Sequence, residues 1–321
     1  MKNKSLITIT SCNRFDVIKK FIWDYLHFVN HNEHFHFVLA LDGNNADYIT
    51  FCLKYGIPLI YSEEREGVGL SKNRVIKKFP NYEYYFFVDD DIELLNDTVF
   101  GTCIDVLNVT GYHHLCGNHI HNLIKSETIL NKTITHSTTG GGYFSCYTQK
   151  SLEVIGGWNT LFAKYKRYGH SEHTYRVMNS GLQPSPFIFV EELKKDLIVH
   201  SPPSVSDKNE ANKNEWVLEE QQLINEKTTY FPLETICLYY FNEQHFGYNQ
   251  KVADFIASNP QKYPLTKGKE RRVALAEYYA LKIPKTGSFF KKLNLLLKSI
   301  WLSPTNVALK HFIKSKFIGR K

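Results

Sequence analysis

The sequence has no long hydrophobic run and no closely spaced cysteines. A membrane-spanning helix needs about 18 or more consecutive apolar residues, and no such stretch occurs. The six cysteines are scattered without a CxxC pair, which argues against a zinc ribbon and against a dense disulfide scaffold. The short basic start leads directly into a strand-like run and lacks the features of a signal peptide. We therefore expect a cytoplasmic protein with reduced thiols.

Acidic residues are absent from 282–321, although the whole chain has a net charge of +7. Within 285–321, apolar residues recur at helical spacing with lysines and arginines between them, a pattern typical of a helix lying in a lipid headgroup layer. We expect this tail to bind an anionic membrane surface, so that the protein is peripheral at the inner face of the cell membrane. A helix packed on the protein's own core is the alternative. A nucleic-acid partner is not expected, because the basic residues cluster with apolar ones.

The first half of the chain alternates strand patterns with helix patterns. Residues 6–11 and 35–41 are β-branched or apolar runs, and 84–88 (YYFFV) is a continuous apolar and aromatic run typical of a central strand. Such alternation indicates an α/β fold with a parallel, doubly wound sheet, in which ligands bind at the carboxyl ends of strands. Asp42 and the run Asp89–Asp91 fall at such ends.

Further elements are expected on both sides of this region. Asn13 is predicted to cap a helix that continues to Val29. The stretch 111–147 is interpreted as strands and turns. The patterns farther along predict helices at 150–155 and 170–180 and short strands at 187–190 and 197–200.

Asp89, Asp90 and Asp91 directly follow the strand 84–88. Three consecutive carboxylates repel one another, and a fold tolerates them best where a cation neutralises them. Mn²⁺ or Mg²⁺ is the natural candidate, because hard cations take oxygen ligands and bridge diphosphates. The alternative is an acidic turn in which an aspartate caps the next helix.

Several motifs, taken in order, resemble those of the GT-A glycosyltransferases, in particular the large bacterial family 2 of inverting enzymes. The likeness covers roughly residues 5–200 and rests on order and spacing. The pieces are Thr10-Ser-Cys-Asn-Arg14, Asp42, Gly67-Val-Gly-Leu-Ser-Lys-Asn73, the Asp89-x-Asp91 motif, and Gly156-Gly-Trp-Asn159 followed by Phe162.

The resemblance implies a mixed sheet flanked by helices and a site for a nucleotide-sugar, usually a UDP-sugar. The residues that it implies at the donor are Thr10, Cys12, Arg14, Asp42 against the base, Lys72 in place of an arginine, Asn73, Asp89, Asp90 and Gly142. It implies that Asp89 and Asp91 bind the metal. His200 ends the strand pattern 197–200, in a region where such enzymes commonly complete the metal site with a histidine.

The resemblance also places an acceptor side after the glycine-rich turn. Trp158, Asn159, His170 and His173 are its expected residues. An acidic pair usually opens the next helix and supplies the general base. Here Glu172 is the one carboxylate in the segment 168–176, so it is assigned the base role. His170 or His173 is the fallback, because imidazole titrates near neutrality.

Four other histidines resemble a metal cluster at first sight: His113, His114, His119 and His121. No cysteine or aspartate accompanies them at structural-zinc spacing, so we interpret them as strand-edge residues.

These features predict a catalytic domain at 1–214, with a nucleotide half at about 1–110 and an acceptor half at about 111–214. A helical extension (215–284) and the basic tail (285–321) follow. The expected activity is transfer of a hexose or N-acetylhexosamine from a UDP-sugar to a glycan or glycolipid in bacterial surface polysaccharide assembly. The alternatives are a sugar nucleotidyltransferase, which would usually carry a longer glycine-rich N-terminal loop, and a non-catalytic sugar-binding module.

Overall fold

The computed structural model describes residues 4–117, 122–165, 169–200, 213–233 and Leu297. The chain divides into two compact units, Met1–Asn249 and Gln250–Lys321. Apart from Leu297, the predicted basic tail 285–321 lies outside the described residues, as does most of the predicted extension 215–284. Among the described residues, no helix combines the length and apolar character needed to cross a bilayer.

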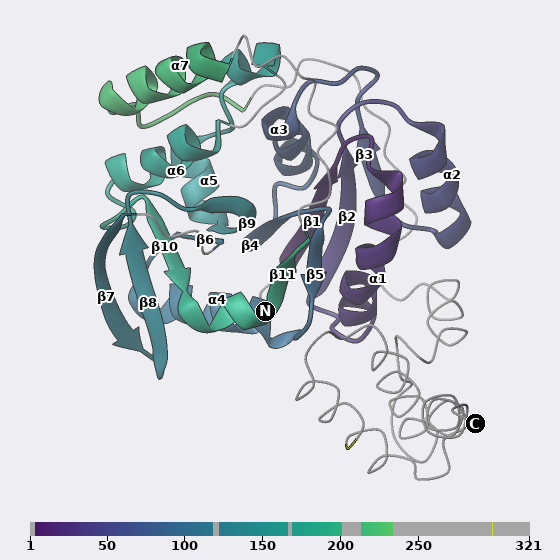
Figure 1. Cartoon of the computed structure of the whole chain (residues 1–321), viewed down its shortest axis with the longest axis horizontal. Coiled ribbons are helices and arrows are strands. Elements are labelled where there is room, and N and C mark those ends of the chain that lie inside the picture. Colours follow the sequence, from purple (N-terminus) through teal and green to yellow (C-terminus); the bar gives the residue numbers. More distant parts are fainter. Residues whose placement is uncertain (1–3, 118–121, 166–168, 201–212, 234–296, 298–321) are drawn as a thin grey trace, which may run out of the picture. The chain divides into compact units, whose positions relative to one another are not determined.

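The described elements follow one another as a run of alternating strands and helices, then a strand-rich middle, then further helices (Figure 1). In chain order they are β1 (Ser5–Ser11), α1 (Phe15–Asn30), β2 (Phe35–Leu41), α2 (Ala46–Tyr55), β3 (Leu59–Tyr61), α3 (Val68–Lys78), β4 (Tyr84–Asp89), β5 (Ile92–Leu94), α4 (Thr98–Thr110), β6 (His114–Gly117), β7 (Leu123–Ile129), β8 (Lys132–Ser137), β9 (Gly141–Thr148), α5 (Gln149–Ile155), η1 (Thr160–Tyr165), α6 (His170–Asn179), β10 (Phe187–Val190), η2 (Glu191–Lys195), β11 (Leu197–Val199) and α7 (Lys213–Asn225).

A six-stranded sheet in the order β3-β2-β1-β4-β9-β6 forms the centre of the first unit. The first four strands of that order are parallel, whereas β9 runs antiparallel to both β4 and β6. The mixed sheet flanked by helices is confirmed, and the wholly parallel sheet suggested by the alternation alone is wrong beyond β4. All seven residues of β1 are buried, because helices cover both faces of the sheet.

Helix α3 packs on one face of this sheet although four consecutive residues in it are polar: Ser71, Lys72, Asn73 and Arg74. All four are buried, and Val75 and Ile76 beside them join the apolar core around Phe87 and Trp158. A buried polar group costs free energy unless it has a partner. The partners of these side chains decide the geometry of the site.

Two smaller sheets complete the unit. The strands β10, β8 and β7 form one sheet in that order, and β11 pairs antiparallel with β5 in the other. The second pairing matters for the site, because the backbone N–H of His200 donates to the carbonyl of Asp91 at 3.0 Å. Residues 109 positions apart along the chain therefore meet just after the end of β4.

The start of α1 differs from the prediction. Asn13 has a left-handed backbone (φ 51°), and Arg14 occupies the N-cap position without a side-chain cap. Asn13 is therefore not the cap, and the helix begins at Phe15. The turn at Asn13 instead brings the backbone N–H of Arg14 to the Tyr48 hydroxyl at 2.9 Å.

Helix α7 packs against α6, and the chain after it continues along the turn that follows α5. Phe231 donates its N–H to the carbonyl of Ile155 at 3.1 Å and accepts from the N–H of Gly157 at 3.0 Å. Residues 213–233 therefore lie in the same compact unit as the sheet. The predicted domain limits at 110, 214 and 284 stay predictions.

Gly156 has a conformation and surroundings that other residues cannot share. Its φ is +73°, and a Cβ there would lie 1.7 Å from the carbonyl oxygen of Phe231. We expect Gly156→Ala to lower the free energy of unfolding by about 2–5 kcal/mol, from backbone strain plus overpacking. Gly101→Ala is the matched control, because its Cβ would meet nothing within 4 Å on the exposed face of α4.

The control should raise the free energy of unfolding by about 0.5–1 kcal/mol, since alanine is the better helix former. Urea denaturation of both variants measures the difference. Equal stability of the two would mean that the turn at Gly156 is not held by Phe231.

Candidate active site

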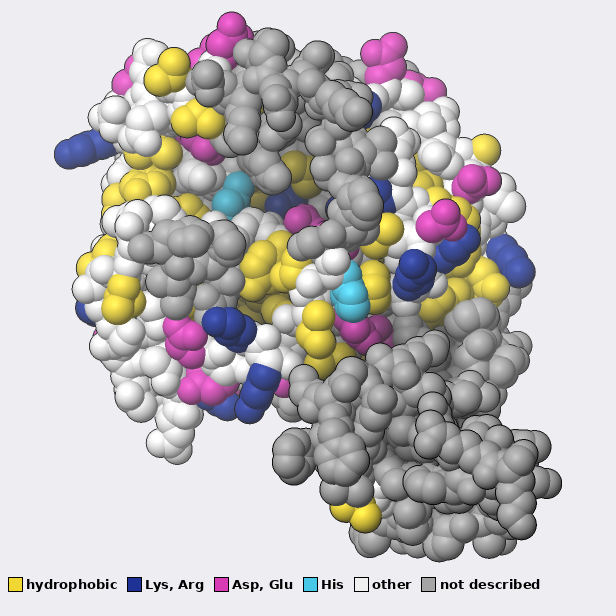
Figure 2. Space-filling model, in the orientation of Figure 1, with side chains coloured by type: hydrophobic (Ala, Val, Ile, Leu, Met, Phe, Trp, Pro, Cys, Tyr) yellow, Lys and Arg dark blue, Asp and Glu magenta, His cyan; other side chains and the backbone are white. Residues whose placement is uncertain are grey.

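The carboxyl ends of β1, β2 and β4 lie at one edge of the sheet and carry the polar residues that the sequence singled out. Thr10 is paired in register with Asp89, and Asp42 directly follows β2. Figure 2 shows a hollow on the described surface, lined by hydrophobic side chains and with histidine, acidic and basic side chains around it. The geometry therefore brings together residues from three separate stretches of the chain.

The three aspartates occupy different environments at the end of β4. Asp90 is buried, and burial, partly offset by Arg14, raises the pKa of its carboxyl to about 7. Asp89 is partly exposed, and desolvation raises its pKa to about 6 while the Lys72 ammonium opposes the shift. Asp91 directly follows Asp90 in the chain and is 8% exposed. Asp90 is therefore the most enclosed of the three.

Arg14 neutralises part of this charge. Its guanidinium forms an ion pair with Asp90 and a second one with Asp91 at 3.3 Å. The hydroxyl of Ser11 donates to Asp90, and the Tyr48 hydroxyl lies 2.7 Å from that of Ser11. Asp90 is thus held inside a polar network, whereas Asp89 and Asp91 flank it on either side.

Lys72 is a second cation close to this edge. Its side chain is buried, and its ammonium lies over the rings of Phe87 and Trp158 at 5.5 and 5.1 Å. Burial lowers the pKa of the ammonium, and the charge of Asp89 opposes that shift. A buried cation beside a carboxylate can hold an anionic group of a ligand, such as a diphosphate.

Asp42 and Cys12 lie near the same edge. One carboxylate oxygen of Asp42 accepts from the N–H groups of Glu66 and Gly67 at 2.7 and 2.9 Å, so Asp42 holds the loop that leads into α3. Cys12 is partly exposed, and burial together with the charge of Asp42 raises the pKa of its thiol to about 11. Their predicted contacts with a nucleotide stay predictions.

The aspartates at the end of β4 can be compared with what a divalent-cation site requires. No group of three or more His, Cys, Asp and Glu residues within the described ranges is arranged to hold a metal ion. Asp89 and Asp91 are nevertheless a suitable pair of oxygen donors, because Mg²⁺-type cations are often held by one or two carboxylates plus phosphate oxygens and water. The imidazole of His200 is engaged elsewhere: Nε2 lies 2.8 Å from Glu93, and the ring stacks on Phe21.

The turn after α5 is held by Asn73 of α3. The Asn73 amide donates to the carbonyl of Trp158 at 2.8 Å and accepts from its N–H at 2.7 Å. A Cβ on Gly157 would lie 2.7 Å from the Asn73 oxygen, so glycine allows this approach. Trp158 itself is 1% exposed and packs against Phe87. Both ends of the Asn73 side chain are therefore used in holding this turn.

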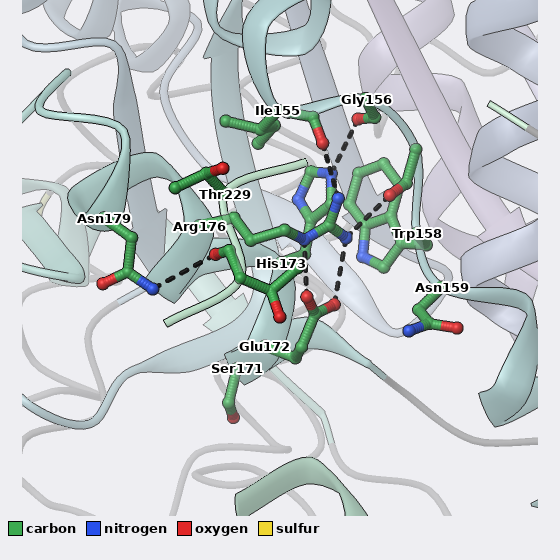
Figure 3. Close-up of polar contacts among 12 residues, drawn as sticks. Ile155, Gly156, Trp158, Asn159, Ser171, Glu172, His173, Arg176, Asn179 and Thr229 are labelled. Carbon is green, nitrogen blue, oxygen red and sulfur yellow. Dashed lines mark hydrogen bonds and ion pairs between the residues drawn. The ribbon is translucent and has the colours of Figure 1, made fainter. Parts of the chain in front are cut away.

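Arg176 ties the same turn to α6, as Figure 3 shows. Its guanidinium donates to the carbonyls of Ile155 and Gly157 at 2.6 and 2.7 Å. It also binds both oxygens of Glu172, one turn earlier in the helix, at 2.6 and 2.9 Å. Burial raises the pKa of Glu172 and lowers that of Arg176, so both charges are costly to bury and each depends on the other.

The two histidines of α6 differ in their partners. His173 stacks on Trp158 at 3.8 Å between ring centroids, and its two ring nitrogens lie 3.2 Å from the Tyr147 hydroxyl and the Gly156 carbonyl. His170 is 7% exposed, and neither of its ring nitrogens has a hydrogen-bond partner among the described residues. Burial lowers its pKa well below 6.5, and Lys72 adds to the shift. His170 is therefore a neutral ring with two unused polar atoms.

The remaining predicted residues surround this helix. A Cβ on Gly142 of β9 would lie 3.0 Å from the His170 ring, so the two residues are neighbours. Asn159 is buried and accepts from the N–H of Leu161 at 2.9 Å. Of the four histidines outside the site, His113 and His114 form hydrogen bonds at the sheet, and His119 and His121 lie outside the described residues.

Sequence reasoning missed three residues: Ser11, which donates to Asp90, Tyr48, which is hydrogen-bonded to Ser11, and Arg176, which binds Glu172. One signal was available for the last pair. Glu172 and Arg176 are four residues apart on a helix, the spacing at which opposite charges meet. No local pattern pointed to Tyr48, because it joins Ser11 through the tertiary fold.

Comparisons with known proteins support the fold. No family model matches the chain, and no curated protein matches its sequence. Among solved structures, it is similar to residues 1–349 of TarS from S. aureus in complex with UDP-GlcNAc, with a TM-score of 0.52 and 13% identity over 98% of this chain and 93% of that one. A likeness to the mannosyltransferase PcManGT from Pyrobaculum calidifontis, in complex with GDP-Man and Mn²⁺, has a TM-score of 0.44 and 11% identity over 98% and 76% of the two chains. The resemblance to GT-A glycosyltransferases is confirmed for the fold.

The buried pair of Glu172 and Arg176 has a testable energetic consequence. Arg176→Met leaves a buried carboxylate and two backbone carbonyls without their donor, so we expect it to lower the free energy of unfolding by about 3–5 kcal/mol. Glu172→Gln keeps an acceptor for the guanidinium and should cost less, about 1–3 kcal/mol. Asp16→Asn, in the exposed pair with Lys19, is the control and should leave the denaturation midpoint unchanged. Equal losses of unfolding free energy in all three variants would mean that the buried pair of Glu172 and Arg176 does not stabilise the fold.

Proposed function

We propose that the protein is a metal-dependent glycosyltransferase that moves a hexose or N-acetylhexosamine from a UDP-sugar to a hydroxyl group of a glycan or glycolipid. The observation that carries the proposal is the set of Asp89, Asp91 and Lys72 at the end of β4, in a fold shared with a structure that was solved with UDP-GlcNAc. Two carboxylates and a buried cation suit a diphosphate with its counter-ion.

The donor would lie over the carboxyl ends of β1 and β4, next to Arg14. A divalent cation, Mn²⁺ or Mg²⁺, would neutralise charge on the diphosphate as UDP departs. Asp89 and Asp91 are the residues that would hold it, and Lys72 would add a fixed positive charge from the protein. His200 would have to release Glu93 before it could join the cation, so it is the least prepared of the predicted ligands.

The acceptor hydroxyl needs a group that takes its proton. The oxygen then bonds to the anomeric carbon while the bond from that carbon to the diphosphate oxygen breaks, and UDP leaves with the electron pair. Attack from the face opposite the leaving group would invert the anomeric centre.

Three candidates for the base came from the sequence, and their surroundings support one of them. Both oxygens of Glu172 are held by Arg176, and both ring nitrogens of His173 have partners. His170 has two ring nitrogens without a hydrogen-bond partner among the described residues, so one of them is free to accept a proton. Burial lowers the pKa of the ring, which keeps it neutral but also makes it a weaker base. We therefore place the base on His170 ahead of Glu172.

The wider role rests on sequence. Assembly of a bacterial surface polysaccharide, a lipid-linked acceptor and a position at the inner face of the cell membrane remain proposals. They depend on the basic, apolar pattern of 285–321 and on no described residue other than Leu297.

A donor assay tests the main proposal. Incubation with Mn²⁺ and UDP-linked Gal, GalNAc, Glc or GlcNAc should release UDP, and EDTA should stop the release. Asp89→Asn and Asp91→Asn should each abolish it, because the diphosphate would lose its counter-ion, whereas the exposed control Asp105→Asn should retain it. Pyrophosphate release from UTP and a sugar phosphate, without UDP release, would favour the nucleotidyltransferase instead.

Substitution of two of the candidates, His170 and Glu172, tests the base. We expect His170→Asn to lower kcat by about 10²- to 10⁴-fold with unchanged donor affinity and folding, because asparagine cannot take the proton. Glu172→Gln should instead lower stability and keep turnover in the folded fraction. A folded but inactive Glu172→Gln beside an active His170→Asn would return the base to Glu172.

A further inference from the structure

Helix α6 begins without a side-chain cap of its own. Its N-cap residue is Gly169, which has a left-handed backbone with φ at 57°. A Cβ at this position would lie 2.6 Å from the ring of Phe162, so Ser, Asp or Asn could not replace the glycine without displacing that ring. The first N–H groups of a helix have no partner within the helix. The first turn of α6 therefore needs an acceptor from elsewhere in the chain.

Glu220 of α7 supplies that acceptor. Its Oε1 accepts from the backbone N–H of Ser171 at 3.2 Å and from that of Glu172 at 3.3 Å. These are the second and third residues of α6, the positions that an ordinary N-cap side chain would serve. Glu220 is 8% exposed and lies 48 residues beyond Glu172 in the chain.

The carboxylate is well placed by charge as well as by geometry. The amino end of a helix carries a partial positive charge that favours an anion. Burial raises the pKa of Glu220 to about 6, the two N–H donors oppose the shift, and the negative charge of Glu172 adds to it. Among the described residues in the first turn of α6, Glu172 is the charged group that acts on the Glu220 carboxylate. The His170 ring beside it is neutral.

The residue at the start of the capped turn is His170, which has unused ring nitrogens. A loose first turn would let its backbone and its imidazole shift relative to β9 and Lys72. A misplacement of about 1 Å can cost an enzyme about a hundredfold in rate.

We propose that Glu220 is a positioning residue, which caps α6 from α7 and thereby fixes the direction of the His170 imidazole toward the acceptor hydroxyl. This role rests on the proposed transfer reaction with His170 at its centre. It also makes a segment beyond residue 212 part of the active-site structure, because no side chain at Gly169 can take its place.

The experiment compares Glu220→Ala, Glu220→Gln and the exposed α7 control Glu215→Ala. Backbone hydrogen exchange at Ser171 and Glu172 is read first. We expect faster exchange in Glu220→Ala, and wild-type exchange in Glu220→Gln, since the amide oxygen still accepts. Exchange at Ser180, at the far end of α6, should be the same in all variants and shows that the helix remains folded.

Kinetics are read on the same samples at a temperature where all variants are folded. Glu220→Ala should lower kcat by about 10- to 100-fold with unchanged donor affinity, and Glu220→Gln should restore it to within about threefold of the wild type. Wild-type kcat in Glu220→Ala, or failure of Glu220→Gln to restore either readout, would overturn the role. Failure of the proposed reaction is distinguishable, because wild-type protein would then release no UDP while the exchange measurement would still report the cap.

Discussion

The hydrogen bonds and ion pair of the Arg176 guanidinium are the interactions on which the turn after α5 and the start of α6 depend. It binds the carbonyls of Ile155 and Gly157 and both oxygens of Glu172, so one side chain joins the turn after α5 to the helix that carries His170. Burying the charges of Glu172 and Arg176 costs free energy. The hydrogen bonds that the planar guanidinium donates compensate for this cost. Asn73 holds the same turn from α3, and Phe231 holds it through backbone hydrogen bonds.

At the end of β4, buried charges are likewise held by partners, but here the carboxylates are in excess. Three aspartates meet at the end of β4, and Arg14, Ser11 and Lys72 offset their repulsion. Because Lys72 and Asn73 are consecutive in α3, one helix supplies a cation near the end of β4 and an amide to the turn after α5. The burial of α3 therefore couples the two halves of the candidate site.

Much of the fold could be predicted because its strands carry strong local signals. The runs that became β1, β2 and β4 are β-branched or aromatic, and the strand at 187–190 was predicted with the bounds of β10. The cap of α1 was predicted wrongly, because Asn13 has a left-handed backbone and its turn serves Tyr48 instead. The antiparallel course of β9 has no local signature, since direction in a sheet depends on the connection and not on the strand's residues.

The sequence by itself determined the kinds of chemistry present: carboxylates after a buried strand, a lysine in a glycine-led helix, and a helix with two histidines and a glutamate. The tertiary structure decided which of these groups have partners. Glu172 and His170 lie two residues apart in the chain. Arg176 binds the carboxylate of Glu172, whereas the His170 ring has no hydrogen-bond partner among the described residues. The physical reason is that burial and pairing depend on residues brought together from far along the chain. Glu220 caps a helix that begins 50 positions earlier, and no periodicity or motif in a single sequence encodes that contact.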